Sequence, residues 1–207
     1  MKKMILTCCI ATLLCLSLFA QSTKRTQITI ATNDVHLVYQ VADNGRLYQT
    51  YLGKPLRNTT EYALLPMGQE AYITHGMEDY FEPAIRVLHN DGNPSLLLKY
   101  VSHTQQLRKP GITETVITLS DDKYPVIVKL FFIAFAEENI IKEYTEISHQ
   151  EKKPVTLYNY ASSMLHLKSD RYFLTEFAGD WAHEANMTER QLDYGKKTVD
   201  TKLGSRA

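Results

Sequence analysis

The sequence predicts an all-β protein, built as a large antiparallel β-sandwich. Ten runs of residues either alternate apolar and polar side chains or are strongly apolar, and Gly, Pro, Asn and Asp clusters separate them. Tyrosine is abundant, with 13 residues against one tryptophan, and large aromatic side chains suit half-buried sheet faces. Helices do not alternate with the strands, which argues against a doubly wound sheet or a TIM barrel within this chain.

The first three strands are predicted from alternation and from the turns that separate them. Gln27–Ala31 and Val35–Val41 alternate apolar and polar side chains. Asp43-Asn44-Gly45 is a strong turn signal, and Arg46–Leu52 alternates again after it. Gly53-Lys54-Pro55 ends this third strand.

An irregular stretch, residues 57–83, follows the third strand. It contains Pro66, Gly68, Gly76 and Pro83 and is long for a connection within a compact domain. Long loops of this kind often carry function, and acidic and aromatic residues mix at 78–82. We therefore expect this part of the loop either to face a ligand or simply to shape the loop.

Seven further strands are predicted in the second part of the chain. Within this part, Val126–Ala136 is so apolar that it predicts a central strand buried on both faces. Only Thr188–Leu192 has a helical character, and it is short. The seven strands are Ala84–His89, Leu96–His103, Glu114–Leu119, Val126–Ala136, Ile140–Ser148, Val155–Leu167 and Tyr172–Phe177.

Residues 1–20 are typical of a secretory signal peptide. Lys2 and Lys3 precede an apolar run of about 15 residues, which is shorter than the roughly 20 residues of a membrane span, and Ala20 is a plausible cleavage residue. The alternative is a retained membrane anchor. We predict a leader at 1–20 and one sandwich domain over residues 21–207.

All three cysteines, Cys8, Cys9 and Cys15, lie within this leader. The mature chain would therefore have no disulfide, thiolate metal site or cysteine nucleophile. A cysteine-free exported protein of this size suits a bacterial periplasm or surface better than a disulfide-bonded secretory domain.

Charge and motifs give no sign of a cofactor or of nucleic acid. The chain has 23 basic and 23 acidic residues, and loss of Lys2 and Lys3 with the leader leaves a net charge near −2. This balance predicts no nucleic-acid or membrane-surface partner. The seven histidines lack the spacing of a zinc site, no phosphate-binding glycine loop occurs, and no pair of carboxylates stands out as catalytic. We predict no metal, no cofactor and no catalytic residue in this chain.

The single tryptophan, Trp181, lies in the segment Phe177–Glu184, beside Gly179, Asp180 and Glu184. An indole face packs well on the apolar face of a pyranose, while nearby carboxylates accept hydrogen bonds from hydroxyl groups. The segment therefore indicates a sugar-stacking platform. The alternative is a core tryptophan on a strand.

Several segments resemble the N-terminal domain of family 36 glycoside hydrolases, the bacterial α-galactosidases. Gly76–Ala84 is similar to the Gly-x-x-Asp-Phe-x-x-Pro-Ala segment of that family, and Gly179–Glu184 is similar to its Gly-x-Trp-x-Arg-Glu motif, with His183 in place of the arginine. The match runs in order from about Val35 to Gly204. Its other segments are Tyr48–Leu56, Leu98–His103, Ile140–Ile147 and Pro154–Leu157.

The resemblance implies a β-sandwich of the super-sandwich type that precedes a catalytic TIM barrel. It implies that Trp181 reaches the barrel and contacts galactose. Asp79 and Glu184 also match the family, and they either stand at the rim of the substrate site or only shape their loops. The expected partners are a galactose-containing oligosaccharide and the missing barrel of the same enzyme, and homo-oligomerisation of the intact enzyme stays open. The two catalytic aspartates of the barrel have no counterpart here, so we expect a sandwich that is incomplete at its C-terminus and inactive alone.

Three other functions are also compatible with the sequence. A free-standing carbohydrate-binding module would need a sugar platform that works without a barrel. A mutarotase-like enzyme would need a histidine and a carboxylate as acid and base, and His166 and His183 are available for this. The third is a plain structural surface protein.

Overall fold

The computed structural model describes residues 25–76, 81–180 and 182–200. The chain divides into two compact units after His166, and each unit is described by itself. The predicted leader, residues 1–20, lies outside the described residues. Within the described ranges, no helix has the length and apolar character needed to cross a membrane.

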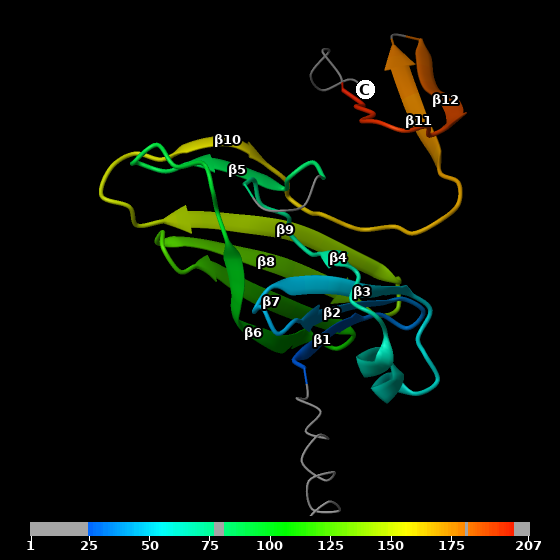
Figure 1. Ribbon diagram of the computed structural model, residues 1–207. Coiled ribbons are helices and arrows are strands. Elements are labelled where there is room, and N and C mark those ends of the chain that lie inside the picture. Colours follow the sequence, from blue (N-terminus) through cyan, green and yellow to red (C-terminus); the bar gives the residue numbers. More distant parts are fainter. Residues whose placement is uncertain (1–24, 77–80, 181, 201–207) are drawn as a thin grey trace, which may run out of the picture. The chain divides into compact units, whose positions relative to one another are not determined.

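The first unit is a sandwich of antiparallel sheets (Figure 1). One four-stranded sheet has the order β1-β2-β3-β4 and the other has the order β6-β7-β8-β9. The first sheet consists of β1 (Gln27–Ala31), β2 (His36–Val41), β3 (Leu47–Gly53) and β4 (Gln69–Glu70). The second consists of β6 (Leu98–Lys109), β7 (Ile112–Asp121), β8 (Val126–Phe135) and β9 (Ile140–His149).

A third, two-stranded sheet completes the first unit. It pairs β5 (Ile85–Leu88) with β10 (Thr156–Tyr160), and Figure 1 shows the pair above β9. A short 3-10 helix, η1 (Thr59–Leu64), and β4 interrupt the predicted irregular stretch 57–83. The second unit contains the remaining two strands, β11 (Phe173–Asp180) and β12 (His183–Gln191).

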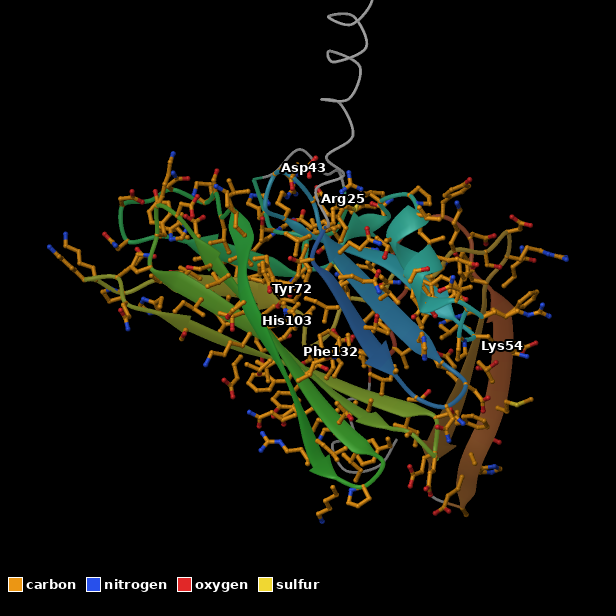
Figure 2. The ribbon with its side chains drawn as sticks, turned by 90° about the horizontal axis from the view of Figure 1, so that it is seen from below. Arg25, Asp43, Lys54, Tyr72, His103 and Phe132 are labelled. Atoms are coloured by element: carbon orange, nitrogen blue, oxygen red, sulfur yellow. The ribbon has the colours of Figure 1, made fainter. Side chains whose placement is uncertain are left out.

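The core lies between the two four-stranded sheets. Tyr39 on β2 and Phe132 on β8 meet there, with ring centroids 5.4 Å apart, and Figure 2 labels Phe132 and the buried Tyr72 in the interior. Alternate residues of each strand point inward, as the period of a strand requires. Inward-facing apolar residues include Ile28, Ile30, Leu37, Leu47, Ile117, Leu119, Val126, Val128 and Leu130.

The all-β prediction and most strand positions are confirmed. The prediction of a β8 buried on both faces is wrong, because its residues alternate between buried and partly or fully exposed positions. Its outward face is nevertheless rich in apolar residues, and Phe131 stacks on Tyr144 of β9 with ring centroids 4.6 Å apart. Cross-strand stacking of this kind shields outward-facing aromatic rings from water. Apolar residues are therefore found on both faces of β8, and its sequence is apolar throughout most of its length.

Other predicted elements also differ from the structure. β6 continues beyond His103 to Lys109, because Thr104–Lys109 pairs with β7 although it is largely exposed on both faces and so shows no alternation. The predicted strand Val155–Leu167 ends at Tyr160. Thr188–Leu192 is not helical: its first four residues belong to β12, since pairing with β11 overrides the local preference.

We expect the core contact at Phe132 to carry a large share of the stability of the first unit. Phe132→Ala removes a fully buried ring and should cost about 3–5 kcal/mol of unfolding free energy, measured by urea denaturation. Phe131→Ala is the matched control on the same strand and should cost about 1 kcal/mol, because its ring is only half-buried. Equal losses for the two variants would contradict this assignment of the core.

Candidate functional site

The segment singled out in the sequence, Phe177–Glu184, spans the turn of the hairpin in the second unit. β11 and β12 pair antiparallel, with Phe177 opposite Met187 and Asp180 opposite His183. The register shifts between Ala178 and Asp180, which marks a bulge just before the turn. Bulges re-aim side chains and often lie beside functional sites.

The backbone around this turn is unusual for its residue types. Ala182 has φ 60° and Ala185 has φ 56°, a left-handed conformation that L-residues with a Cβ seldom adopt. The Asn186 side-chain amide donates a hydrogen bond to the carbonyl of His183 at 3.2 Å and so braces the bend between them. Two such residues within four positions point to a turn whose shape matters more than its local stability.

The sequence-predicted site residues fall partly outside the described ranges. Trp181, between β11 and β12, and Asp79, in the long loop, both lie outside the described residues. Glu184 is exposed on β12, next to the equally exposed His183. The predicted grouping of Trp181, Asp79 and Glu184 therefore stays a prediction.

The hairpin lines a cavity of about 450 Å³ within the second unit. Glu176 on β11 and Arg190 on β12 form an ion pair across the two strands, with 3.2 Å between the carboxylate and guanidinium atoms. Thr188 donates a hydrogen bond to the same carboxylate at 3.5 Å. The lining residues are Glu176, Phe177, Ala178, Gly179, Arg190, Thr198, Val199 and Asp200.

This cavity has the size and chemistry of a small polar-ligand site. A volume of a few hundred Å³ matches the smaller ligand pockets of proteins. Glu176 and Asp200 offer carboxylate acceptors, Arg190 offers guanidinium donors, and Phe177 offers an aromatic surface. Hydroxyl-rich ligands such as sugars are recognised by this combination.

Sequence reasoning found only one side of this cavity. Phe177, Ala178 and Gly179 belong to the predicted segment, whereas Glu176, Arg190 and the 198–200 stretch were not singled out. Recognising Thr188–Leu192 as part of a strand would have placed Thr188 opposite Glu176, with Arg190 diagonally next to it. The pairing register of these two strands is therefore the signal that could have found Glu176 and Arg190. Interpreting Thr188–Leu192 as helical hides this pairing.

A second polar cluster, around His89, is structural. The two ring nitrogens of His89 lie 2.6 Å from a Glu151 carboxylate oxygen and 3.1 Å from the Ser95 carbonyl oxygen, and its ring stacks on Tyr124 at 3.5 Å. Burial acts to raise the pKa of Glu151, but hydrogen bonds from Asn90 and His89 outweigh it and leave this pKa below its usual value. Since the side chains of His89 and Glu151 are almost fully buried, they join three turns rather than face a ligand.

His166 is also engaged in structure. Its Nε2 lies 2.7 Å from the carbonyl oxygen of Glu70, and its backbone N–H donates to the Gln49 side chain at 2.9 Å. This placement disfavours His166 as the acid or base of a mutarotase-like site. Among the described residues, no three His, Cys, Asp or Glu side chains are grouped to hold a metal ion.

The comparison with protein families decides the identity of the domain. The model described as the glycosyl hydrolase family 36 N-terminal domain matches residues 40–207. The chain belongs to this family. The match covers both the second sheet of the sandwich and the β11–β12 hairpin, and it confirms the resemblance found in the sequence.

Similar proteins are α-galactosidases. A probable α-galactosidase G from Aspergillus terreus is 26% identical over 142 residues, which are 62% of this chain and 20% of that protein. The chain thus spans about a fifth of the length of the curated relatives it matches. These relatives come from fungi, which conflicts with the bacterial origin predicted from the sequence.

Solved structures share the fold. The α-galactosidase from Lactobacillus brevis superposes with a TM-score of 0.70 at 18% identity, covering 84% of this chain and 28% of that one. A family 36 α-galactosidase variant from Geobacillus stearothermophilus, solved with stachyose, gives a TM-score of 0.71 at 18% identity, covering 81% of this chain and 28% of that one. The N-terminal β-sandwich of family 36 is therefore the fold of this chain.

Proposed function

We propose that this chain is the N-terminal β-sandwich part of a longer α-galactosidase, which hydrolyses terminal α-galactosides, and that its hairpin contributes Trp181 to the substrate site. The observation that carries this proposal is the family 36 match over residues 40–207. The named relatives, all α-galactosidases, and the stachyose complex of a structural neighbour support the same substrate class.

The chemistry of the proposed reaction belongs outside this chain. Retaining hydrolysis of a glycoside needs two carboxylic acids about 5 Å apart, one as nucleophile and one as acid and base. In our proposal a barrel that follows the sandwich in the full-length enzyme supplies both groups. The sandwich then contributes binding and orientation of the sugar, and the chain alone is inactive.

The hairpin is suited to this binding role. Trp181 falls between β11 and β12, beside a turn whose left-handed Ala182 and Ala185 fix an unusual backbone path. An indole stacked on galactose removes apolar surface from water, while carboxylates such as Glu184, and Asp79 from the long loop, accept hydroxyl hydrogen bonds at the rim. The cavity lined by Glu176 and Arg190 offers further polar contacts next to this turn.

A free-standing carbohydrate-binding module is the second candidate. The observation that favours it is that residues of the second unit alone line the 450 Å³ cavity. Such a module would bind galactosides without any barrel.

We also propose export through a secretory signal over residues 1–20, which carries all three cysteines. The mature protein from expressing cells should begin near residue 21, which intact mass and N-terminal sequencing of the secreted protein would show. A protein retained in the membrane with residues 1–20 attached would contradict this proposal.

In the full-length enzyme, Trp181→Ala should lower kcat/KM for raffinose by about 10- to 100-fold, because a stacking contact of about 1.4–2.7 kcal/mol is lost. Trp181→Phe should recover part of the loss. Tyr194→Ala is the matched control, since Tyr194 is a fully exposed aromatic residue of the same unit, and it should leave kcat/KM unchanged. An unchanged kcat/KM in Trp181→Ala would remove the substrate-contact role.

The binding-module alternative is tested on the 207-residue chain. Trp181 is its only tryptophan, so its fluorescence reports on a sugar at the hairpin directly. Our first proposal predicts no saturable change on titration with galactose or raffinose up to tens of millimolar. A saturable change that is abolished by Glu176→Gln would favour the free-standing module.

A further inference from the structure

A segment without strand pairing, residues 161–166, crosses the edge of the sandwich beside β9; we call it the strap. Both backbone polar groups of its first residue, Ala161, form hydrogen bonds. The backbone N–H of Ala161 donates to the Ala84 carbonyl at 2.7 Å, and the Tyr72 hydroxyl donates to the Ala161 carbonyl at 2.8 Å. The Thr145 hydroxyl on β9 donates to the Ser162 carbonyl at 2.8 Å.

The other end of the strap is held by the first sheet. Gln49 on β3 makes two hydrogen bonds to the backbone of His166, one as donor at 2.7 Å and one as acceptor at 2.9 Å. Between the ends, the Ile73 N–H lies 3.5 Å from the Met164 sulfur. The strap therefore bridges β9 and the first sheet through individual hydrogen bonds, most of which involve a side chain, and not through a strand ladder.

A carboxylic acid lies beneath the strap. Glu143 on β9 is paired with the buried Phe132 of β8, so its side chain points inward, and it hydrogen-bonds to Ser163 of the strap. Its neighbours along β9, Lys142 and Tyr144, belong to the opposite face. Glu143 is partly buried, as are the next two residues, Tyr144 and Thr145, so the pairing with Phe132 is what fixes its orientation.

The surroundings of Glu143 favour its neutral form. Burial raises the pKa of Glu143 to about 7, although the hydrogen bond from Ser163 opposes this shift. The titratable groups that face it from the first sheet side are Tyr39 on β2 and Tyr72, which Figure 2 labels in the interior. Burial raises the pKa of Tyr72 to about 12 and that of Tyr39 well above its usual value, so both stay neutral.

We propose that the strap is a pH-dependent closure of the sandwich edge, which stays closed while Glu143 carries a proton and opens when Glu143 ionises. The partly buried carboxylate would be incompletely hydrated under the closed strap, and opening lets more water reach it. The strap is also the segment that leads from the sandwich into Leu167 and the hairpin unit.

The direction of the pH effect follows from linkage. Below pH 4.5, the ordinary value for glutamate, the carboxyl is protonated with the strap open or closed, and pH has no effect. Between pH 4.5 and about 7 the open form loses its proton and the closed form keeps it, so opening becomes steadily more favourable. Between pH 5 and pH 8 the opening constant should rise on the order of 10- to 100-fold and level off above pH 7.

Amide hydrogen exchange on the chain, measured by NMR at pH 5 to 8 and corrected for the intrinsic exchange rate, tests this proposal. The protection factors of the Ala161 and His166 amides should fall about 10- to 100-fold over this range, while that of Val128 in β8 stays constant. In Glu143→Gln the strap should stay protected at every pH. Glu146→Gln, an exposed glutamate on the same strand, is the matched control and should behave like the parent.

Ser163→Ala supplies an independent variant. Since the Ser163 hydrogen bond opposes the rise in the pKa of Glu143, its removal should move the midpoint of the strap transition to higher pH. Three results would overturn the proposal: strap protection that does not change with pH, a pH effect that persists in Glu143→Gln, or a parallel fall at Val128. These outcomes do not depend on galactoside binding and are separate from the proposed function.

Discussion

Burial of two apolar sheet faces against each other, with Tyr39 of β2 meeting Phe132 of β8, is the contact on which the other features of the first unit depend. The same layer orders β5, whose Ile85 and Val87 join the core, and it fixes β9, whose inner face carries Glu143. A sandwich made this way leaves its edges open to water. Here one of these edges is covered by residues 161–166, which are held there by side-chain and backbone hydrogen bonds.

Much of the fold could be predicted from the sequence, because strand periodicity and turn chemistry are local properties. Asp43-Asn44-Gly45 marks the turn between β2 and β3, and Gly45 has the positive φ that such a turn uses. The prediction of strands failed where only hydrogen bonding to a neighbouring strand, and no pattern in the sequence, marks the strand. The outer part of β6, residues 104–109, is a strand because β7 lies beside it, and its exposed faces carry no alternation.

The candidate site was predictable in part. Trp181 and its Gly and acidic neighbours drew attention to the hairpin that lines the cavity, because their residue types carry sugar-binding chemistry. Glu176 and Arg190 were missed, since neither residue stands out alone and their meaning comes from meeting across β11 and β12. Glu143 was missed for a related reason. The sequence of β9 gives no sign that a segment distant in the chain, the strap, lies next to this side chain.

The strap and the proposed substrate-binding hairpin are adjacent in the chain. The strap holds the end of the sandwich at His166, and the residues that follow build the hairpin that we assign to substrate contact.

The central claim, that this domain serves a catalytic barrel, is tested most directly by the nucleotide sequence beyond the codon for Ala207. Our account predicts an open reading frame, continuous or restored by a single-base shift, that encodes a barrel with two carboxylates placed for retaining hydrolysis. A stop codon followed by unrelated sequence would contradict it.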